Sequence, residues 1–159
     1  MASTLTVDNI VGATSASTIH IPGHVIQVVS NTNSYTANSG FLLESTSTSF
    51  VAAALSASIT PKFASSKIMI SISTTNYRSG DVSVTIYRGS TNLGGSTYGM
   101  ARLTTATNKW HNVSLVHLDS PNTTSAITYQ LYSRAESGTT YIGGDGNQLN
   151  NIVLMEIAQ

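Results

Sequence analysis

Serine, threonine and histidine are the residues of this chain that could supply a nucleophile and a general base. The stretch nearest to a nucleophile elbow is "GGSTYG", Gly94 to Gly99. An elbow of the G-x-S-x-G type needs glycine two residues after the serine, but Tyr98 stands in that position relative to Ser96. The spacing therefore predicts a loop, and the neighbouring sequence indicates neither a base nor a third group to orient it.

Paired carboxylates would support glycoside hydrolysis, which needs two acidic side chains facing each other across the bond. Nearly all of the acidic residues fall in predicted turns or loops, where aspartate is common for conformational reasons. They are Asp8, Glu44, Asp81, Asp119, Glu136, Asp145 and Glu156. Their spacing indicates no facing pair, so we expect no catalytic residues and no enzymatic activity.

The four histidines fall into two pairs. His20 and His24 flank the segment "IPG", and His111 and His117 are six residues apart, an even spacing that puts both on one face of a strand. A zinc site needs three or four ligands, and neither pair has a third. We therefore expect no metal site and no cofactor. His24 is the one weak candidate, because a three-fold axis would bring three copies of its imidazole together.

Charged side chains are scarce, at 9% of the 159 residues, and seven basic residues balance seven acidic ones. No run of lysine or arginine could neutralise a row of phosphates, so nucleic acid is not an expected partner. No window approaches the roughly 18 apolar residues of a membrane span, and the N-terminus lacks a secretory signal. A surface of hydroxyls with zero net charge has little electrostatic protection against association. We therefore expect an assembled protein.

Short β-rich runs separated by turn residues recur from His24 onward and predict an all-β chain. The run "KIMISIST" alternates Ile68, Ile70 and Ile72 with polar residues, and "DVSVTIYR" alternates in the same way. A Ser-Gly-Asp turn signal between these two runs predicts a hairpin. The overall prediction is a single antiparallel β-sandwich over residues 23–159.

Residues 1–22 have no sustained period of either 3.6 or 2, which predicts an extended N-terminal arm. A segment without a core of its own becomes ordered mainly by lying on something else, so we expect the arm to lie on a neighbouring chain. Its apolar anchors would be Leu5, Val7, Ile10 and Val11. The alternative is a short strand that packs on its own sandwich.

Two of the predicted strands are apolar on both faces. In "NIVLMEIA", Val153, Met155 and Ile157 alternate with two further apolar residues, and "HVIQVV" behaves similarly. One face of an antiparallel strand usually meets water, so a doubly apolar strand suggests cover by another subunit. The predicted oligomer-interface residues are Val25, Ile26, Val28, Val29, Ile152 and Leu154. The alternative is a central strand that its own chain covers on both faces.

Several phrases of strand and turn resemble small structural proteins and fibre modules of tailed bacteriophages, especially phages of cyanobacteria and marine bacteria. The phrases are "MASTLTVDNIVGATSAS", "IPGHVIQVV", "ITPKFASSKIMISIS", "VTIYRGSTNLGG", "LDSPNTTSAITYQLYSR" and "NNIVLMEIAQ". The phrases are spread from residue 1 to residue 159, the similarity extends over nearly the whole chain, and the phrases contain no catalytic signature.

The resemblance implies a jelly-roll-like sandwich that forms a homotrimer and extends its N-terminal arms to the particle or to neighbouring trimers. One short domain without a long shaft favours a capsid decoration (cement) protein. Such a protein would be assembled in the bacterial host cytoplasm and would bind the major capsid protein on the virion surface. The alternative is a tail or head fibre tip that binds host-surface glycan through loops such as Asn31 to Gly40. A depolymerase is the third class of function.

Overall fold

The computed structural model describes residues 21–34, 40–104, 108–144 and 148–159. The predicted arm lies almost entirely outside these ranges, and so do its expected anchors Leu5, Val7, Ile10 and Val11. The arm therefore stays a prediction. Within the described ranges no helix is long and apolar enough to cross a membrane.

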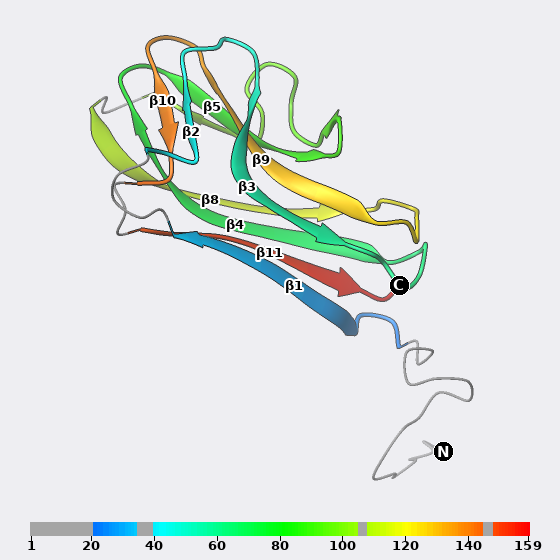
Figure 1. The fold of residues 1–159 in the computed structure, drawn as a ribbon. Helices are drawn as coiled ribbons and strands as arrows, with labels where there is room; N and C mark the ends of the chain where they lie inside the picture. The colour runs from blue at the N-terminus through cyan, green and yellow to red at the C-terminus, as the bar shows by residue number, and fades with distance from the viewer. Residues whose placement is uncertain (1–20, 35–39, 105–107, 145–147) are drawn as a thin grey trace, which may run out of the picture.

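The described residues form two antiparallel sheets that pack face to face (Figure 1). Sheet A has the order β1-β11-β4-β10-β2, and β8 also pairs with β4. Its strands are β1 (Val25–Ser34), β2 (Leu43–Ser45), β4 (Lys67–Arg78), β8 (Lys109–Asp119), β10 (Thr140–Ile142) and β11 (Leu149–Ile157). Figure 1 shows its long strands β1, β11, β4 and β8 as one layer.

Sheet B forms the facing layer. It has the order β3-β9-β5-β6, and β7 also pairs with β5. Its strands are β3 (Val51–Ile59), β5 (Val82–Arg88), β6 (Thr91–Asn92), β7 (Ala101–Leu103) and β9 (Ile127–Ala135). The predicted all-β sandwich is therefore confirmed.

The core lies between the two sheets and is filled by alternate residues of the long strands. On β4, Ile68, Ile70 and Ile72 are fully buried, whereas the residues between them face outward. The buried side chains of sheet B that meet them include Leu55, Ile59, Ile86, Tyr129 and Leu131. The two-residue period in the sequence predicted the inward face of β4 correctly, because successive side chains of a strand point to opposite faces.

The predicted hairpin between the runs at β4 and β5 is wrong. β4 pairs within sheet A and β5 pairs within sheet B, so the short link between them crosses from one sheet to the other. Gly80 in this link lies against Ser137, where a Cβ atom would clash with the Ser137 carbonyl oxygen. The buried Arg78 donates to the carbonyl oxygens of Gly80, at 3.1 Å, and Leu103, at 2.6 Å. These buried contacts make the turn a corner of the sandwich.

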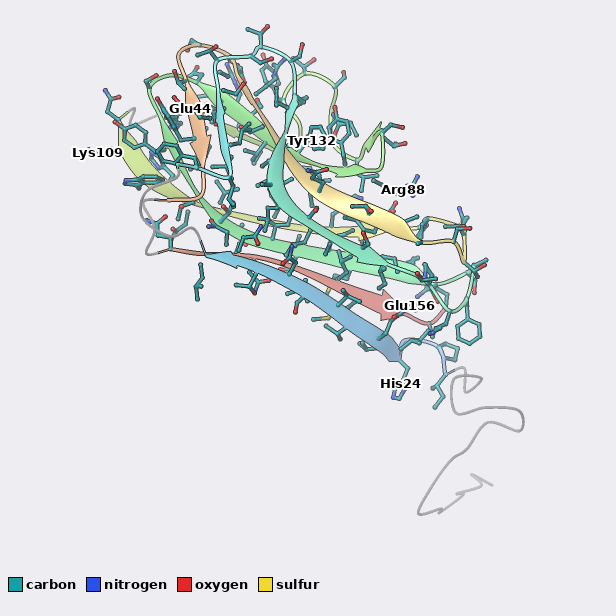
Figure 2. The ribbon with its side chains drawn as sticks, viewed as in Figure 1. His24, Glu44, Arg88, Lys109, Tyr132 and Glu156 are labelled. Carbon is teal, nitrogen blue, oxygen red and sulfur yellow. The ribbon has the colours of Figure 1, made fainter. Side chains whose placement is uncertain are left out.

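Glu156 is a fully buried carboxylate at the end of the sandwich where β1 begins (Figure 2). It accepts hydrogen bonds from the Gln27 side-chain amide at 2.6 Å and from the backbone N–H groups of Lys62, at 2.7 Å, and Phe63, at 3.2 Å. The contacts connect β11 with β1 and with the loop between β3 and β4. A buried charge is tolerated only when such donors surround it.

Replacing Glu156 by alanine should lower the free energy of unfolding by about 2–4 kcal/mol, because two backbone N–H groups and one side-chain amide lose their acceptor. Urea unfolding followed by circular dichroism measures this change. Glu44 is exposed on β2, so Glu44→Ala is the matched control and should change stability by less than about 0.5 kcal/mol. Equal effects of the two substitutions would contradict the anchoring role of Glu156.

Candidate functional site on the outer face of sheet A

The segment Gly94–Gly99 is a tight loop, as the sequence predicts. A β-bridge between Gly95 and Gly99 closes it, with backbone N···O distances of 3.0 and 2.9 Å. A Cβ atom on Gly94 would lie 2.6 Å from the hydroxyl oxygen of Thr85, so glycine allows the loop to lie against β5. The geometry is that of a packed surface loop.

Asp119 joins the two sheets at the end of β8. Arg88 Nη1 lies 2.9 and 2.8 Å from its two carboxylate oxygens, and the hydroxyl of Tyr129 donates to it at 2.7 Å. Burial, followed by the hydrogen bond to Asp119, raises the pKa of Tyr129 well above its usual range. Tyr129 therefore stays protonated and acts as a fixed donor across the core.

Glu136 and Asp81 share one cation, Arg102. The Arg102 Nη2 atom lies 2.5 Å from Glu136 Oε2 and 3.6 Å from Asp81 Oδ2, and the Ser83 hydroxyl donates to Glu136 at 2.6 Å. The hydrogen bonds from Arg102 and then from Ser83 hold the pKa of Glu136 below its usual range. A carboxylate held ionised in this way is a poor general acid near neutral pH.

His24 is exposed at the start of β1 (Figure 2), and His20 lies outside the described residues. His111 and His117 share one face of β8, as their even spacing predicts. Among the residues that the structure describes, no three His, Asp or Glu side chains lie close enough to hold a metal ion. A metal at His24 would need further copies of the chain to supply its other ligands.

The expected oligomer interface is wrong for Ile152 and Leu154. Both are 0% exposed and belong to the core, because β11 lies between β1 and β4 and turns these residues toward sheet B. Val29 of β1 also packs against the core. The sequence did not indicate which of the two apolar faces of each strand points inward.

The other predicted interface residues lie differently on β1. Val25 is 49% exposed and Val28 is 56% exposed, whereas Ile26 is half-buried at the register shift between Val25 and Gln27. Val25 and Val28 remain candidates for contact with another chain, and they point to the outer face of sheet A.

That outer face carries an aliphatic surface at the end near His24. Residues paired in register across antiparallel strands share a face, and one such row crosses β1, β11, β4 and β8 as Val28, Met155, Met69 and Leu118. Val153 and Val116 extend the surface on one side of this row, with Ser71 of β4 between them, and Val25 and Ile157 extend it on the other side. We call these eight residues the aliphatic patch.

The aliphatic patch is open to solvent and free of charge. Val116 is 67% exposed and Leu118 is 49% exposed, in addition to the two valines of β1. Lys67, which pairs with Ile157, is the charged residue at its margin. A contiguous apolar surface of this kind usually marks a contact with another molecule.

Polar side chains separate the aliphatic patch from a second apolar group at the other end of the same face. Ser114, Ser73, Asn151 and Thr32 pair across β8, β4, β11 and β1. Beyond them lie four rings, which we call the aromatic cluster: Phe41, Tyr77, Trp110 and Tyr141. The aromatic cluster adjoins Glu44 and Lys109, which Figure 2 shows at the end of the molecule opposite His24.

Sequence reasoning missed the part of the patch on β4 and β8. The outward residues Met69, Val116 and Leu118 stand between polar residues or beside inward apolar ones, so neither strand looks doubly apolar. The signal would have been the pairing register, which brings them beside Met155 and Val28.

Comparison with known proteins finds no match among protein-family models and none among curated proteins.

Replacing Glu136 by glutamine should lower stability at neutral pH, and the difference from wild type should shrink as the pH falls. The folded pKa of Glu136 is depressed, so its contribution is present above the unfolded value of about 4.3 and is lost as pH falls through the folded pKa. Urea midpoints measured from pH 7 to pH 3 test this. In an Arg102→Gln background the same substitution should have a smaller effect; an unchanged effect would show that Arg102 is not the cause.

Proposed function

We propose that the protein is a structural, non-catalytic component of a tailed-bacteriophage virion. It is a homotrimeric capsid decoration protein that binds the lattice of the major capsid protein and stabilises the head. The resemblance of its strand and turn phrases to phage structural proteins supports this function. The observation that carries it is the aliphatic patch, because a flat apolar sheet surface serves contact between proteins rather than chemistry.

The aliphatic patch is the proposed centre of the contact between subunits. With strands about 4.8 Å apart and residues about 3.3 Å apart along them, it covers on the order of 300 Å². A specific interface buries about 800 Å² on each partner. The patch therefore supplies an apolar centre, and the serine and asparagine rows beside it supply the polar rim that such interfaces have. Balanced charge leaves little repulsion between copies.

The jelly-roll connectivity implied by the resemblance is part of the proposal. The orders β1-β11-β4-β8 and β3-β9-β5-β7, taken from the observed pairings, support it. In a jelly roll, eight strands divide into two packed sheets and most neighbours within a sheet are not consecutive in the sequence. Virion proteins use this architecture widely.

The N-terminal arms are the proposed attachment to the capsid. Leu5, Val7, Ile10 and Val11 would anchor each arm on coat subunits. A trimer placed where three coat subunits meet matches their symmetry, and three modest contacts that act together give strong attachment.

A single aspartate in the aliphatic patch should dissociate the trimer, because burying an unpaired carboxylate opposes association. Val116→Asp changes the most exposed patch residue of β8. Ala52→Asp is the control, since Ala52 is exposed on β3 of the other sheet. Mass measured by light scattering should fall from three chains to one for Val116→Asp only. A wild-type monomer, or a Val116→Asp trimer, would contradict the proposed subunit contact.

Deleting residues 2–21 should leave a folded sandwich that binds capsids more weakly. The deletion stops before Gly23, whose N–H donates to the Ala158 carbonyl oxygen at 2.8 Å and helps to hold the start of β1. Co-sedimentation with capsids that lack the protein measures attachment, and a thermal melt measures folding. Unchanged attachment would remove the arm from the proposal.

The decisive experiment for the function is the copy number of the protein relative to the major capsid protein in purified virions, by quantitative mass spectrometry. A lattice-wide trimer requires hundreds of copies per particle, as a count on the order of the number of three-fold positions. A few dozen copies or fewer would contradict capsid decoration and favour a fibre tip.

A further inference from the structure

The aromatic cluster is a concentration of rings outside the core. The register of sheet A places Trp110 and Tyr141 on either side of Tyr77, and Phe41 lies just before β2. The ring centroids of Tyr77 lie 5.3 Å from Trp110 and 5.6 Å from Tyr141. Phe41 completes the group at 4.6 Å from Tyr141 and 6.2 Å from Trp110.

These four rings contact one another and are also partly accessible to a ligand. They lie on the outer face, while the adjacent inner positions are filled by buried residues such as Ile142 and Asn76. Trp110 is 38% exposed, and the other three rings are half-buried. Mutual packing therefore holds the ring planes in position and leaves part of the tryptophan open.

Groups that exchange hydrogen bonds surround the aromatic cluster. Asn112 is exposed two residues along β8 from Trp110, on the same face. Glu44 pairs with Tyr141 in register and is exposed, and Lys109 is exposed beside Trp110. The edge of the cluster thus offers an amide, a carboxylate and an ammonium group, with no excess of either charge.

This combination matches a saccharide better than the other ligands that stack on rings. The C–H face of a pyranose is weakly positive and is attracted to the negative face of an aromatic ring, while its hydroxyls need donors and acceptors at the rim. A nucleic acid would also stack, but it needs a cationic groove for its phosphates, and Lys109 stands here with Glu44. The aliphatic patch, about 20 Å away along β8, consists of Val, Ile, Leu and Met side chains and so offers no ring face on which a sugar could stack.

We propose that the aromatic cluster is a binding site for neutral oligosaccharides, with one pyranose ring stacked on Trp110 and bonded to Asn112, and a further sugar of the same oligosaccharide bonded to Glu44. The site is separate from the aliphatic patch and goes beyond capsid decoration. It gives a structural protein a second, weak contact to a carbohydrate surface.

Trp110 is the single tryptophan of the chain, so its fluorescence reports on this site alone. The full-length protein is titrated with cellohexaose, maltohexaose, chitohexaose and a single-stranded oligothymidylate. We expect a saturable change in emission with at least one of the oligosaccharides and none with the oligonucleotide. No change with any oligosaccharide overturns the proposal, and a change with the oligonucleotide alone replaces it with nucleic-acid binding.

Substitutions then separate stacking from a merely structural role, with affinity measured by calorimetry. Trp110→Ala should weaken binding at least about tenfold, the equivalent of roughly 1.4 kcal/mol, whereas Trp110→Phe keeps a ring and should retain most of the affinity. Tyr98→Ala removes an exposed ring outside the aromatic cluster and should bind as wild type. Equal binding by Trp110→Ala and wild type overturns the site, and if the alanine variant does not fold, Asn112→Ala tests the rim with the same expected loss.

Discussion

The burial of one face of β3, β4, β9 and β11 between the two sheets is the constraint on which the other features depend. Ile68, Ile70 and Ile72 on β4 are all 0% exposed, and β11 adds Ile152 and Leu154 at the same level. Because side chains of a strand alternate between faces, this burial requires every other residue of these strands to face the core. The remaining positions are then free of the core, so serine can stand there without loss of packing, as Ser71 and Ser73 do on β4.

Two buried carboxylates lie together at one end of the sandwich, where Glu156 and Asp119 pair with Ile68 from either side. Glu156 gathers donors from β1 and from the loop after β3, and Asp119 connects the end of β8 in sheet A to Arg88 and Tyr129 in sheet B. Burying either carboxylate without donors would cost free energy. Once its donors are in place, each carboxylate favours the one arrangement of strands that supplies them. Together they fix how the two sheets meet in a chain that has no cysteine.

Alternation made the fold class and the inner face of β4 predictable, but long-range pairing was not predictable from the same pattern. The local sequence at Gly80 predicts a hairpin. The contact of Gly80 with Ser137, which is distant in the sequence, belongs instead to a corner between the two sheets. Strand β11 is apolar on both faces, so the choice of inner face required the position of sheet B. The aromatic cluster depends on the pairing of Tyr141 with Tyr77, which are 64 residues apart and share no local signal.

The outer face of sheet A has two chemically different ends because β4 and β8 each change character along their length. The outer face of β8 carries Trp110 near its start and Leu118 near its end, and β4 places Tyr77 opposite Trp110 and Met69 opposite Leu118. Hydroxyl and amide side chains between the two ends keep them from merging into one apolar surface, which would associate without specificity. Only 9% of the residues are charged. The separation of apolar surfaces, which charged side chains often provide in other proteins, is therefore provided here by neutral polar rows. They bound the aliphatic patch and the aromatic cluster, and so they allow one sheet face to carry the two separate contacts that we propose.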